Sequence, residues 1–302
     1  MNHSPNLFLI GAPRCGTTSL FAAMKQHPAI YTTVLKEPHF HARDLPVQPH
    51  TVTDPDDYRQ MFRLAGDRPW RADGSVWHFY SHAAPTLIAE QHPDARIVLL
   101  LRHPVRMVAS LYGLYRRTGN EGEADADIAL LRDGEARYAG TYFPFGLHYR
   151  HLLDVTRPLE RWRAHLDAGR MRVLFHEEFY AAPEAGFAEL CRWLGIDADA
   201  DISFDATVAR DRVREQALRQ IRDLPARVRA SMLPGAGRHH AGQTPFEIAA
   251  STLQRLQAEA QAANRDLPAL LGRPVPAAWQ TAPTARREAR AADAPAVAST
   301  HG

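Results

Sequence analysis

The chain has 302 residues, enough for one large α/β domain or two small ones. Its 36 lysines and arginines nearly balance 34 aspartates and glutamates, which argues against a nucleic-acid-binding protein held by a large basic face. That balance still allows a local basic pocket for a small polyanion. Two cysteines, Cys15 and Cys191, are too few for a disulfide framework, so we expect a reducing, cytoplasmic environment. Residues 1–11 lack the basic flank and long apolar run of a signal peptide, and no segment reaches the roughly 18 apolar residues of a membrane span.

The first part of the chain predicts a strand, a glycine loop and a helix. Residues 7–10 (LFLI) form a short apolar run that ends at Gly11, which is typical of a buried strand. Residues 17–27 carry apolar side chains at helical spacing and stop at Pro28. Residues 29–34 predict a second strand.

The same alternation continues along the chain. Residues 96–101 (RIVLLL) have the strongest strand pattern in the sequence, and Pro104 suits the first turn of a following helix. Residues 171–176 predict another strand, and residues 187–194 lie on a helix that ends at Gly195. Repeated strand–helix pairs predict an α/β fold of the P-loop type, with a mostly parallel central sheet and helices on both faces.

The C-terminal part lacks strand patterns. Residues 208–232 and 245–263 predict two amphipathic helices around a glycine-rich loop, GAGRHHAG, at residues 235–242. Residues 280–302 are rich in alanine and proline and have little to bury, so we expect a disordered tail. We therefore assign one domain to residues 1–279.

A glycine loop with phosphate-binding spacing follows the first strand. Residues 11–18 are GAPRCGTT, with the Gly-x4-Gly spacing of a Walker A loop between a strand and a helix. The first turn of such a helix presents unpaired backbone N–H groups, and the helix dipole favours an anion there. A strand-to-helix turn that merely uses glycines is the alternative, because this spacing alone is weakly specific.

The loop differs from that of a Walker ATPase. Thr17 stands where the ATPase has a lysine, and the cation lies inside the loop at Arg14. This exchange predicts a shorter anion chain and no metal. Cys15 has two interpretations, an acidic thiol near a helix N-terminus or a small residue that fits the loop, and we favour the second.

A second anion site is predicted after residues 96–101. Arg102 follows that strand at the carboxyl end, where open α/β sheets bind ligands, and Ser110 lies two turns into the next helix. An arginine fork and a hydroxyl suit a terminal phosphate. Each residue alone has an ordinary surface interpretation, but together with the first loop they predict a ligand with two separated anions.

Several motifs resemble those of the sulfotransferases that use 3′-phosphoadenosine 5′-phosphosulfate (PAPS). Residues 11–20 resemble the family's 5′-phosphosulfate loop, and residues 102–110 resemble its 3′-phosphate motif, Arg-x-Pro-x-x-Arg-x-x-Ser, at Arg102, Pro104 and Ser110. Residues 36–40 (KEPHF) resemble a segment of bacterial and heparan sulfate sulfotransferases. Residues 75–81 are similar to the family's Ser-Pro-x-Tyr segment, and residues 264–279 to its closing Asn-x-x-Leu…Leu-Gly…Trp pattern.

The resemblance implies a three-layer α/β fold, PAPS as the sulfuryl donor and no metal. Glu37 falls where the heparan sulfate enzymes place their catalytic base. The candidate catalytic residues of this chain are Glu37, Arg14 and His39. The residues carried over for PAPS binding are Arg14, Cys15, Gly16, Thr17, Thr18, Ser19, Arg102 and Ser110.

The sequence departs from the family pattern at three places. Arg14 replaces the commoner lysine, and an arginine stabilises charge on a leaving phosphate but donates no proton to it. His41 stands where a second phenylalanine is usual, and Ala72 and Asp73 stand where Gly-Glu is usual. The departures at His41, Ala72 and Asp73 concern the acceptor pocket more than the PAPS-binding site. The loop at residues 235–242 is loosely similar to the family's basic lid.

The predicted reaction is in-line displacement at sulfur by a hydroxyl or amine of a glycan, lipid or small metabolite. Glu37 is the predicted general base, and His39 is the alternative base or the residue that orients Glu37. Because Glu37 precedes Pro38, we expect an extended segment with both side chains on the same side. His239 and His240 invite a metal interpretation, but no ligand cluster accompanies them in the sequence.

Two other functions remain open. A small-molecule kinase would need a lysine after Gly16 and an aspartate at a later strand end, whereas the strand at residues 96–101 leads into Arg102. A nucleotide-binding module without catalysis is the non-enzymatic alternative, against which the presence of Glu37 and Arg14 argues.

Overall fold

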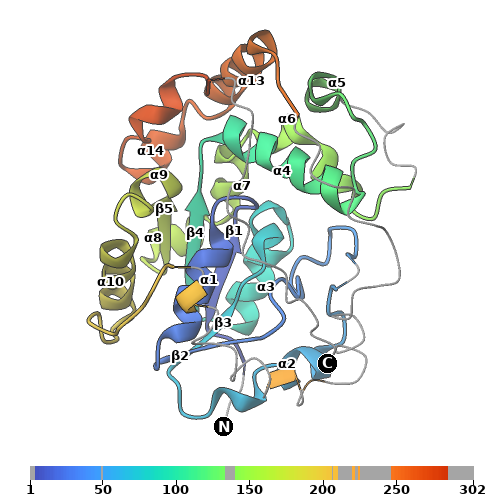
Figure 1. Ribbon diagram of the computed structural model, residues 1–302. Helices are drawn as coiled ribbons and strands as arrows, with labels where there is room; N and C mark the ends of the chain where they lie inside the picture. Colours follow the sequence, from blue (N-terminus) through green and yellow to red (C-terminus); the bar gives the residue numbers. More distant parts are fainter. Residues whose placement is uncertain are drawn as a thin grey trace.

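The centre of the molecule is a parallel sheet covered by helices (Figure 1). The computed structural model describes residues 4–48, 50–132, 140–205, 207–209, 220, 221, 224 and 246–284. The strands are β1 (Leu7–Gly11), β2 (Ile30–Thr32), β3 (Trp70–Asp73), β4 (Arg96–Leu101) and β5 (Met171–Phe175). Their order in the sheet is β2-β3-β1-β4-β5, and each neighbouring pair is parallel. The predicted α/β fold is confirmed.

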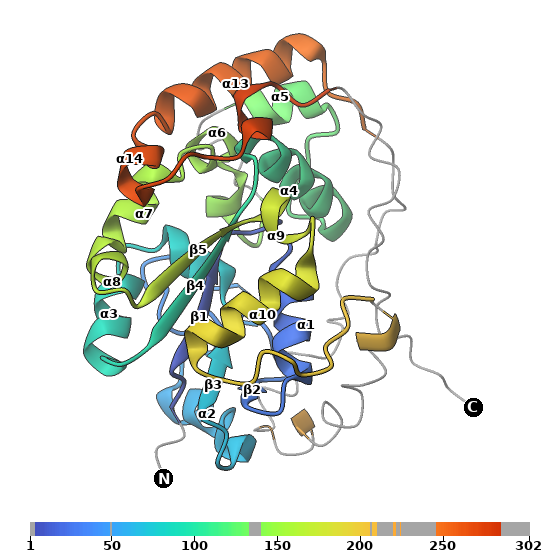
Figure 2. The ribbon, with the colours of Figure 1, turned by 90° about the vertical axis from the view of Figure 1, so that its left-hand side faces the viewer.

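Burial on both faces explains the apolar character of the central strands. All of β1 is buried, and so is β4 from Ile97 to Leu101. Figure 2 shows α1 and α10 on one side of the sheet and α3 and α8 on the other. Strands covered on both faces are continuous apolar runs without alternation, which is why these two were predictable. The covering helices are α1 (Thr17–Gln26), α3 (Ala84–Gln91), α8 (Arg163–Asp167) and α10 (Pro183–Leu194).

Helix α4 (Pro104–Thr118) follows β4 and packs its apolar stripe inward. Pro104 occupies the first turn, and Gly119 ends the helix in the left-handed conformation with φ of 75°. Val108, Leu111 and Tyr115 are buried, as the spacing predicted. The shorter helices of this half are α2 (Pro55–Gln60), α5 (Ala126–Leu131), α6 (Tyr149–Leu152), α7 (Thr156–Arg161) and α9 (His176–Phe179), with 3-10 turns η1 (Arg63–Ala65), η2 (Val76–Tyr80) and η4 (Pro144–Leu147).

The C-terminal helices lie across one end of the molecule (Figure 1). They are α13 (Ala250–Ala263), α14 (Leu267–Leu271) and the 3-10 turn η5 (Ala277–Gln280). The predicted helix at residues 245–263 is confirmed with a later start. Among the described helices, none combines the length and apolar character that a membrane crossing requires.

Several expectations differ from the structure or fall outside it. The sequence did not predict β3, because a four-residue strand that carries Arg71 and Asp73 has no apolar run. The second strand is shorter than residues 29–34. Most of the helix expected at 208–232, the whole loop at 235–242 and residues 285–302 of the expected tail lie outside the described residues.

Candidate functional site

The two predicted anion-binding segments meet at the carboxyl edge of the sheet. The chain leaves β1 toward β2 on one side and leaves β4 toward β5 on the other. The adjacent ends of β1 and β4 therefore form the switch point at which open α/β sheets bind ligands. Residues 11–18 follow β1 and Arg102 follows β4, so the structure brings both segments to this point.

Helix α1 begins from a loop whose geometry suits an anion. Gly16 caps the helix in the left-handed conformation, with φ of 94° and no side-chain acceptor for the first N–H groups. The N–H groups of Ser19 and Leu20 donate back to the Gly16 carbonyl. Those of Thr17 and Thr18 come earlier and have no acceptor within the helix, so this end of α1 favours a negative charge.

Two side chains from the segment after β5 hold this loop in place. The Tyr180 hydroxyl donates to the Gly16 carbonyl at 2.6 Å, and His176 Nδ1 donates to the Cys15 carbonyl at 2.9 Å. A β-carbon at Gly16 would lie 2.5 Å from the Tyr180 ring. Glycine is thus required at this position both for its positive φ and for space.

Arg14, Arg102 and Ser110 form a polar cluster beside the loop. Arg14 Nε donates to Ser110 Oγ at 3.0 Å, and Arg102 Nη1 donates to the Arg14 carbonyl at 3.3 Å. The Nε atom of Arg102 is buried and makes no hydrogen bond with the described residues. The sequence assigned Arg14 and Ser110 to opposite ends of a ligand, whereas here their side chains touch. A buried cationic donor without an acceptor, next to a helix N-terminus, is suited to bind an anion.

The end of strand β3 positions Glu37 and His39. The Glu37 N–H donates to the Gly74 carbonyl, and the His39 N–H donates to the Ser75 hydroxyl, both at 3.0 Å. Ser75 in turn donates to Asp73 Oδ1 at 2.5 Å. The strand that the sequence did not predict is therefore the one that fixes the candidate base.

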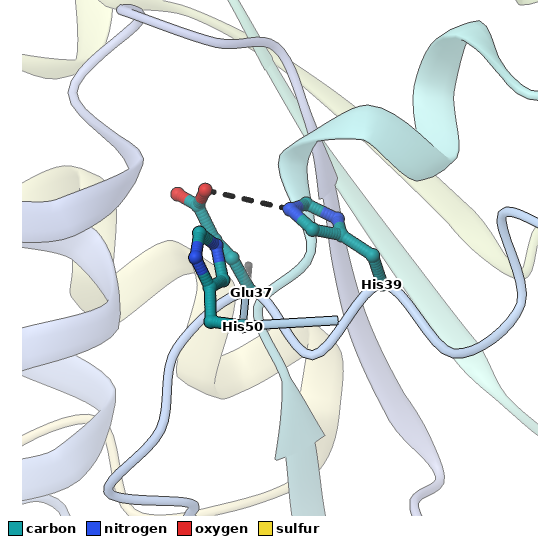
Figure 3. Close-up of side chains that lie close together, drawn as sticks. All are labelled: Glu37, His39 and His50. Carbon is teal, nitrogen blue, oxygen red and sulfur yellow. Dashed lines mark ion pairs between the residues drawn. The ribbon is translucent and has the colours of Figure 1, made fainter. Parts of the chain in front are cut away.

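Glu37 lies between a lysine and a histidine, and Figure 3 shows the ion pair with the histidine, His39. Its Oε1 is 2.6 Å from Lys36 Nζ, and its Oε2 is 3.6 Å from His39 Nε2. Lys36 also donates to the Thr17 hydroxyl at 3.4 Å, which joins Glu37 to the first turn of α1. The Glu37 side chain is 28% exposed, so a ligand can reach it.

The charge state of Glu37 follows from these contacts. Burial disfavours the ionised carboxylate, but the Lys36 ammonium and the His39 ring outweigh that effect and hold the pKa of Glu37 below its usual range. The carboxylate is therefore ionised at neutral pH. It can accept a proton, although less strongly than a carboxylate without a paired cation.

Glu37 and His39 do not have the extended backbone expected before Pro38. Their φ angles are 68° and 51°, in the left-handed region that non-glycine residues rarely adopt. That expectation was wrong because the local bias from proline is weaker than the hydrogen bonds to Gly74 and Ser75. The side chains still approach each other. Conformations of this kind persist where the surroundings impose them, often at functional sites.

Cys15 is a buried free thiol. Burial raises its pKa to about 12 despite the nearby Arg102 guanidinium, so the thiol stays protonated at neutral pH. Its Sγ donates to the Pro13 carbonyl. The structure therefore supports a small residue that fits the loop and not an acidic thiol. Of the remaining candidates, Thr17 is buried and Thr18 and Ser19 are exposed on the first turn of α1.

The sequence did not indicate a role for four residues at this site. They are Lys36, His176, Glu177 and Tyr180. Glu177 accepts hydrogen bonds from the backbone N–H of His103 and from the indole of Trp279, and so ties the segment after β4 to the C-terminal turn. Three of the four follow β5 at its carboxyl end, and that location is the signal that could have found them.

The model of the Sulfotransferase family matches residues 36–200, more than half of the chain. The chain belongs to the sulfotransferase family. The matched range contains Glu37, Arg102 and Ser110 and begins after the loop at residues 11–18.

Individual relatives of the chain are distant. Carbohydrate sulfotransferase 15 of Homo sapiens and that of Mus musculus are each 24% identical over 170 residues, which cover 40% of this chain and 29% of the relative. The chain thus matches less than a third of the length of these relatives. A crystal structure of a sulfotransferase from Alicyclobacillus acidocaldarius has a TM-score of 0.72 at 22% identity, covering 92% of this chain and 99% of that one. This likeness shows the fold over most of the chain.

Proposed function

We propose that this protein transfers the sulfuryl group of PAPS to an acceptor hydroxyl or amine without a metal in the transfer step. The observation that carries the proposal is the pairing of two features at one sheet edge. A cationic cluster of Arg14 and Arg102 lies at the N-terminus of α1, and an ionised carboxylate, Glu37, lies beside the same helix turn. Membership of the sulfotransferase family supports the type of reaction.

The residues present fit a ligand with a phosphosulfate and a separate phosphate. The backbone N–H groups of residues 16–18 would hold the 5′ end, with the Thr17, Thr18 and Ser19 hydroxyls close by. Arg102 and Ser110 would hold the 3′-phosphate, and the buried Nε of Arg102, which makes no hydrogen bond with the described residues, is a donor available for it. Because Arg14 contacts Ser110, its charge would stabilise both the 5′-phosphosulfate and the 3′-phosphate of PAPS.

Transfer requires a proton acceptor and stabilisation of the leaving oxygen. PAPS supplies the sulfuryl group and leaves as 3′-phosphoadenosine 5′-phosphate (PAP). Glu37 would take the proton of the acceptor, with His39 orienting it or replacing it as base. Lys36 lies between Glu37 and Thr17, so it would stabilise charge at the loop and could donate the proton that Arg14 cannot.

The acceptor would enter through a cavity next to His39. It has a volume of about 260 Å³ and a mixed lining that includes Phe40, Arg43, Gln48 and Trp77. Apolar rings with a few hydrogen-bonding groups suit a sugar ring or a small metabolite. The relatives named as carbohydrate sulfotransferases support a glycan acceptor, with lipids and small metabolites as alternatives.

The binding of nucleotides tests the donor site directly. Calorimetry with PAP, AMP and ATP, each with and without a chelator, should show PAP bound at least tenfold more tightly than AMP and without Mg²⁺. Arg102→Ala should remove most of that preference, because a charge-assisted contact contributes about 1.5–3 kcal/mol, roughly 10- to 150-fold in affinity. Arg192→Ala, at an exposed position of α10, is the matched control and should keep the preference.

Equal affinity for PAP and AMP would contradict the two-anion site. Mg²⁺-dependent turnover of ATP would instead establish the kinase. A screen with ³⁵S-labelled PAPS against glycan, lipid and small hydroxyl or amine acceptors tests the transfer itself. Tight PAP binding with no labelled product from any acceptor would favour the non-catalytic module.

A further inference from the structure

Several buried histidines lie close to the segment that carries Glu37. His39, His41 and His78 are 4%, 0% and 0% exposed. His39 Nε2 pairs with Glu37 at 3.6 Å, whereas neither ring nitrogen of His41 or His78 makes a hydrogen bond with the described residues. The Gln91 side chain is a polar neighbour of His41. Buried polar atoms without partners are destabilising, so their concentration in one place calls for an explanation.

Two of these histidines lie together with a carboxylate. One nitrogen of His41, one nitrogen of His78 and one oxygen of Asp73 lie within 4.8 Å of one another, and all three residues are fully buried. The two rings are 5.6 Å apart between centroids and inclined at 74°, so they do not stack. In a tetrahedral zinc site the ligand atoms are about 3.3 Å apart, because each bond to the metal is about 2.0–2.2 Å. Side-chain rotations that shorten each separation by at most about 1.5 Å would therefore bring the three atoms to bonding positions.

Asp73 has the surroundings of a ligating carboxylate. Its Oδ1 accepts from Ser75 and its Oδ2 accepts from the Tyr58 hydroxyl, each at 2.5 Å. Each oxygen can accept a second partner, so ligation remains available to it. Hydrogen bonds from neighbouring side chains to a ligating carboxylate are the usual outer support of a metal site.

The three residues come from separate segments of the chain. His41 follows the segment of Glu37 and His39, Asp73 ends β3, and His78 lies in η2. The fold therefore brings them to one buried point.

We propose that His41, Asp73 and His78 form a buried transition-metal site with a water as the fourth ligand, for which Zn²⁺ is the best match. Two imidazoles and one carboxylate are a common zinc ligand set, whereas Ca²⁺ and Mg²⁺ prefer oxygen ligands alone. A bound ion would tie the segment that carries Glu37 to β3 and η2, and so would act as a structural clamp. The proposal does not depend on the identity of the sulfuryl donor or acceptor.

A second group of ligand atoms lies nearby and is the alternative location. Glu37, His39 and His50 also offer atoms within 4.8 Å of one another (Figure 3). There, however, the Lys36 ammonium already pairs with Glu37 at 2.6 Å and would repel a cation. The buried group has no described cation in contact with its ligand atoms, and this difference favours it.

Metal content and ligand geometry test the site in the full-length protein. The chain is stripped with a chelator, exposed separately to Zn²⁺, Co²⁺ and Mg²⁺, passed through a desalting column and analysed by mass spectrometry for metal. We expect one Zn²⁺ or Co²⁺ per chain, no retained Mg²⁺, the visible absorption of tetrahedral Co²⁺, and a higher melting temperature with Zn²⁺. X-ray absorption at the zinc edge should give bonds of about 2.0–2.1 Å with scattering from two imidazoles.

Variants locate the ion. His41→Phe and His78→Phe keep the site filled with a ring and should lose the metal, and Asp73→Asn should weaken retention at least tenfold. His50→Ala, which changes the alternative group, and a double change of His239 and His240 to alanine should both retain it. Absence of metal from the wild-type protein overturns the proposal, and so does loss in either control with retention in His41→Phe. If the phenylalanine variants do not fold, fewer than two imidazoles at the wild-type zinc edge would overturn it.

Discussion

At the scale of single residues, the candidate base gives the sharpest prediction. Glu37→Gln should keep PAP affinity and lose about 10²- to 10⁴-fold of turnover, because the amide has the size of the carboxylate but cannot accept a proton. Measurement of kcat and of the PAP dissociation constant in the same preparation separates catalysis from binding. Glu184→Gln, on the exposed first turn of α10, is the control and should change neither quantity.

The role of His39 is resolved by the same assay. The 3.6 Å separation of its Nε2 from Glu37 allows His39 either to orient the carboxylate or to take the proton itself. If His39 orients Glu37, His39→Ala should cost less than Glu37→Gln, and the double variant should match Glu37→Gln. Near-normal turnover in Glu37→Gln together with inactivity of His39→Ala would make the histidine the base.

Lys36 sets the pH dependence of the proposed base. Because the ammonium helps to lower the pKa of Glu37, turnover should persist as pH falls below the usual carboxylate value of about 4.3. In Lys36→Met burial is opposed only by His39, so the pKa of Glu37 should rise and the acidic limb of kcat/KM should move to higher pH by about one unit or more. An unchanged acidic limb would show that the limb reports another group.

How far the site was predictable depends on how local each signal is. Residues 11–18 and Arg102 follow strands with strong apolar patterns, so their meeting at the sheet edge could be inferred from the sequence. The contact of Arg14 with Ser110 and that of Lys36 with Glu37 depend on side-chain directions, which no spacing rule supplies. The buried group of His41, Asp73 and His78 was missed because its members are separated in the sequence and join only through β3 and η2.

At the scale of elements, the burial of a strand on both faces decides whether it can be predicted from an apolar run in the sequence. Strands β1 and β4 are covered on both faces and could be predicted from apolar runs alone. Strand β3 could not, because it ends in an aspartate whose charge is accommodated by hydrogen bonds from Ser75 and Tyr58 and not by solvent. A polar side chain with a functional or structural role thus interrupts the apolar pattern, and the strand that carries it is missed in a prediction from sequence.

Asn264, at the end of α13, links this helix to the segment before α7, and the effect of replacing it can be predicted at this scale. Its Oδ1 accepts from the N–H groups of Val155 and Thr156, and its Nδ2 donates to the Leu153 carbonyl. Asn264→Ala leaves these buried groups unpaired and should cost about 1–3 kcal/mol of folding free energy, with PAP affinity unchanged in the folded protein. Thermal unfolding measures the loss. Gln261→Ala, which removes one exposed hydrogen bond, should cost less, and an equal cost would contradict the buried role of Asn264.

At the scale of the whole molecule, one domain up to residue 279 and a reducing compartment remain predictions. Both cysteines are free and buried, which is compatible with reducing conditions. The parallel sheet and the packing of helices on both faces followed from the strand–helix alternation. The path of the C-terminal segment could not be predicted from that alternation. It depends on the hydrogen bond from the indole of Trp279 to Glu177, at 3.1 Å, between residues far apart in the sequence.

Truncation tests where the packed domain ends. The carbonyls of Gln280 and Thr281 accept hydrogen bonds from Gln261 and His103, so the removable tail should begin near residue 285. Removal of residues 285–302 should leave the melting temperature and PAP affinity unchanged, because this Ala/Pro-rich sequence has no apolar periodicity with which to dock.

Removal of residues 277–302 should behave differently. It deletes Trp279, which is 6% exposed and packs at 5.2 Å from the Phe175 ring, and such a loss typically costs about 3–5 kcal/mol. It also releases Glu177, whose other carboxylate oxygen holds the His103 N–H next to Arg102, so PAP affinity should fall as well as stability. Trp279→Phe separates the two effects, since the ring is kept and the hydrogen bond to Glu177 is lost. Thermal unfolding and PAP calorimetry on the two truncated proteins and on Trp279→Phe measure these losses of stability and of PAP affinity. A large loss of melting temperature on removal of residues 285–302 alone would show that the tail packs against the domain.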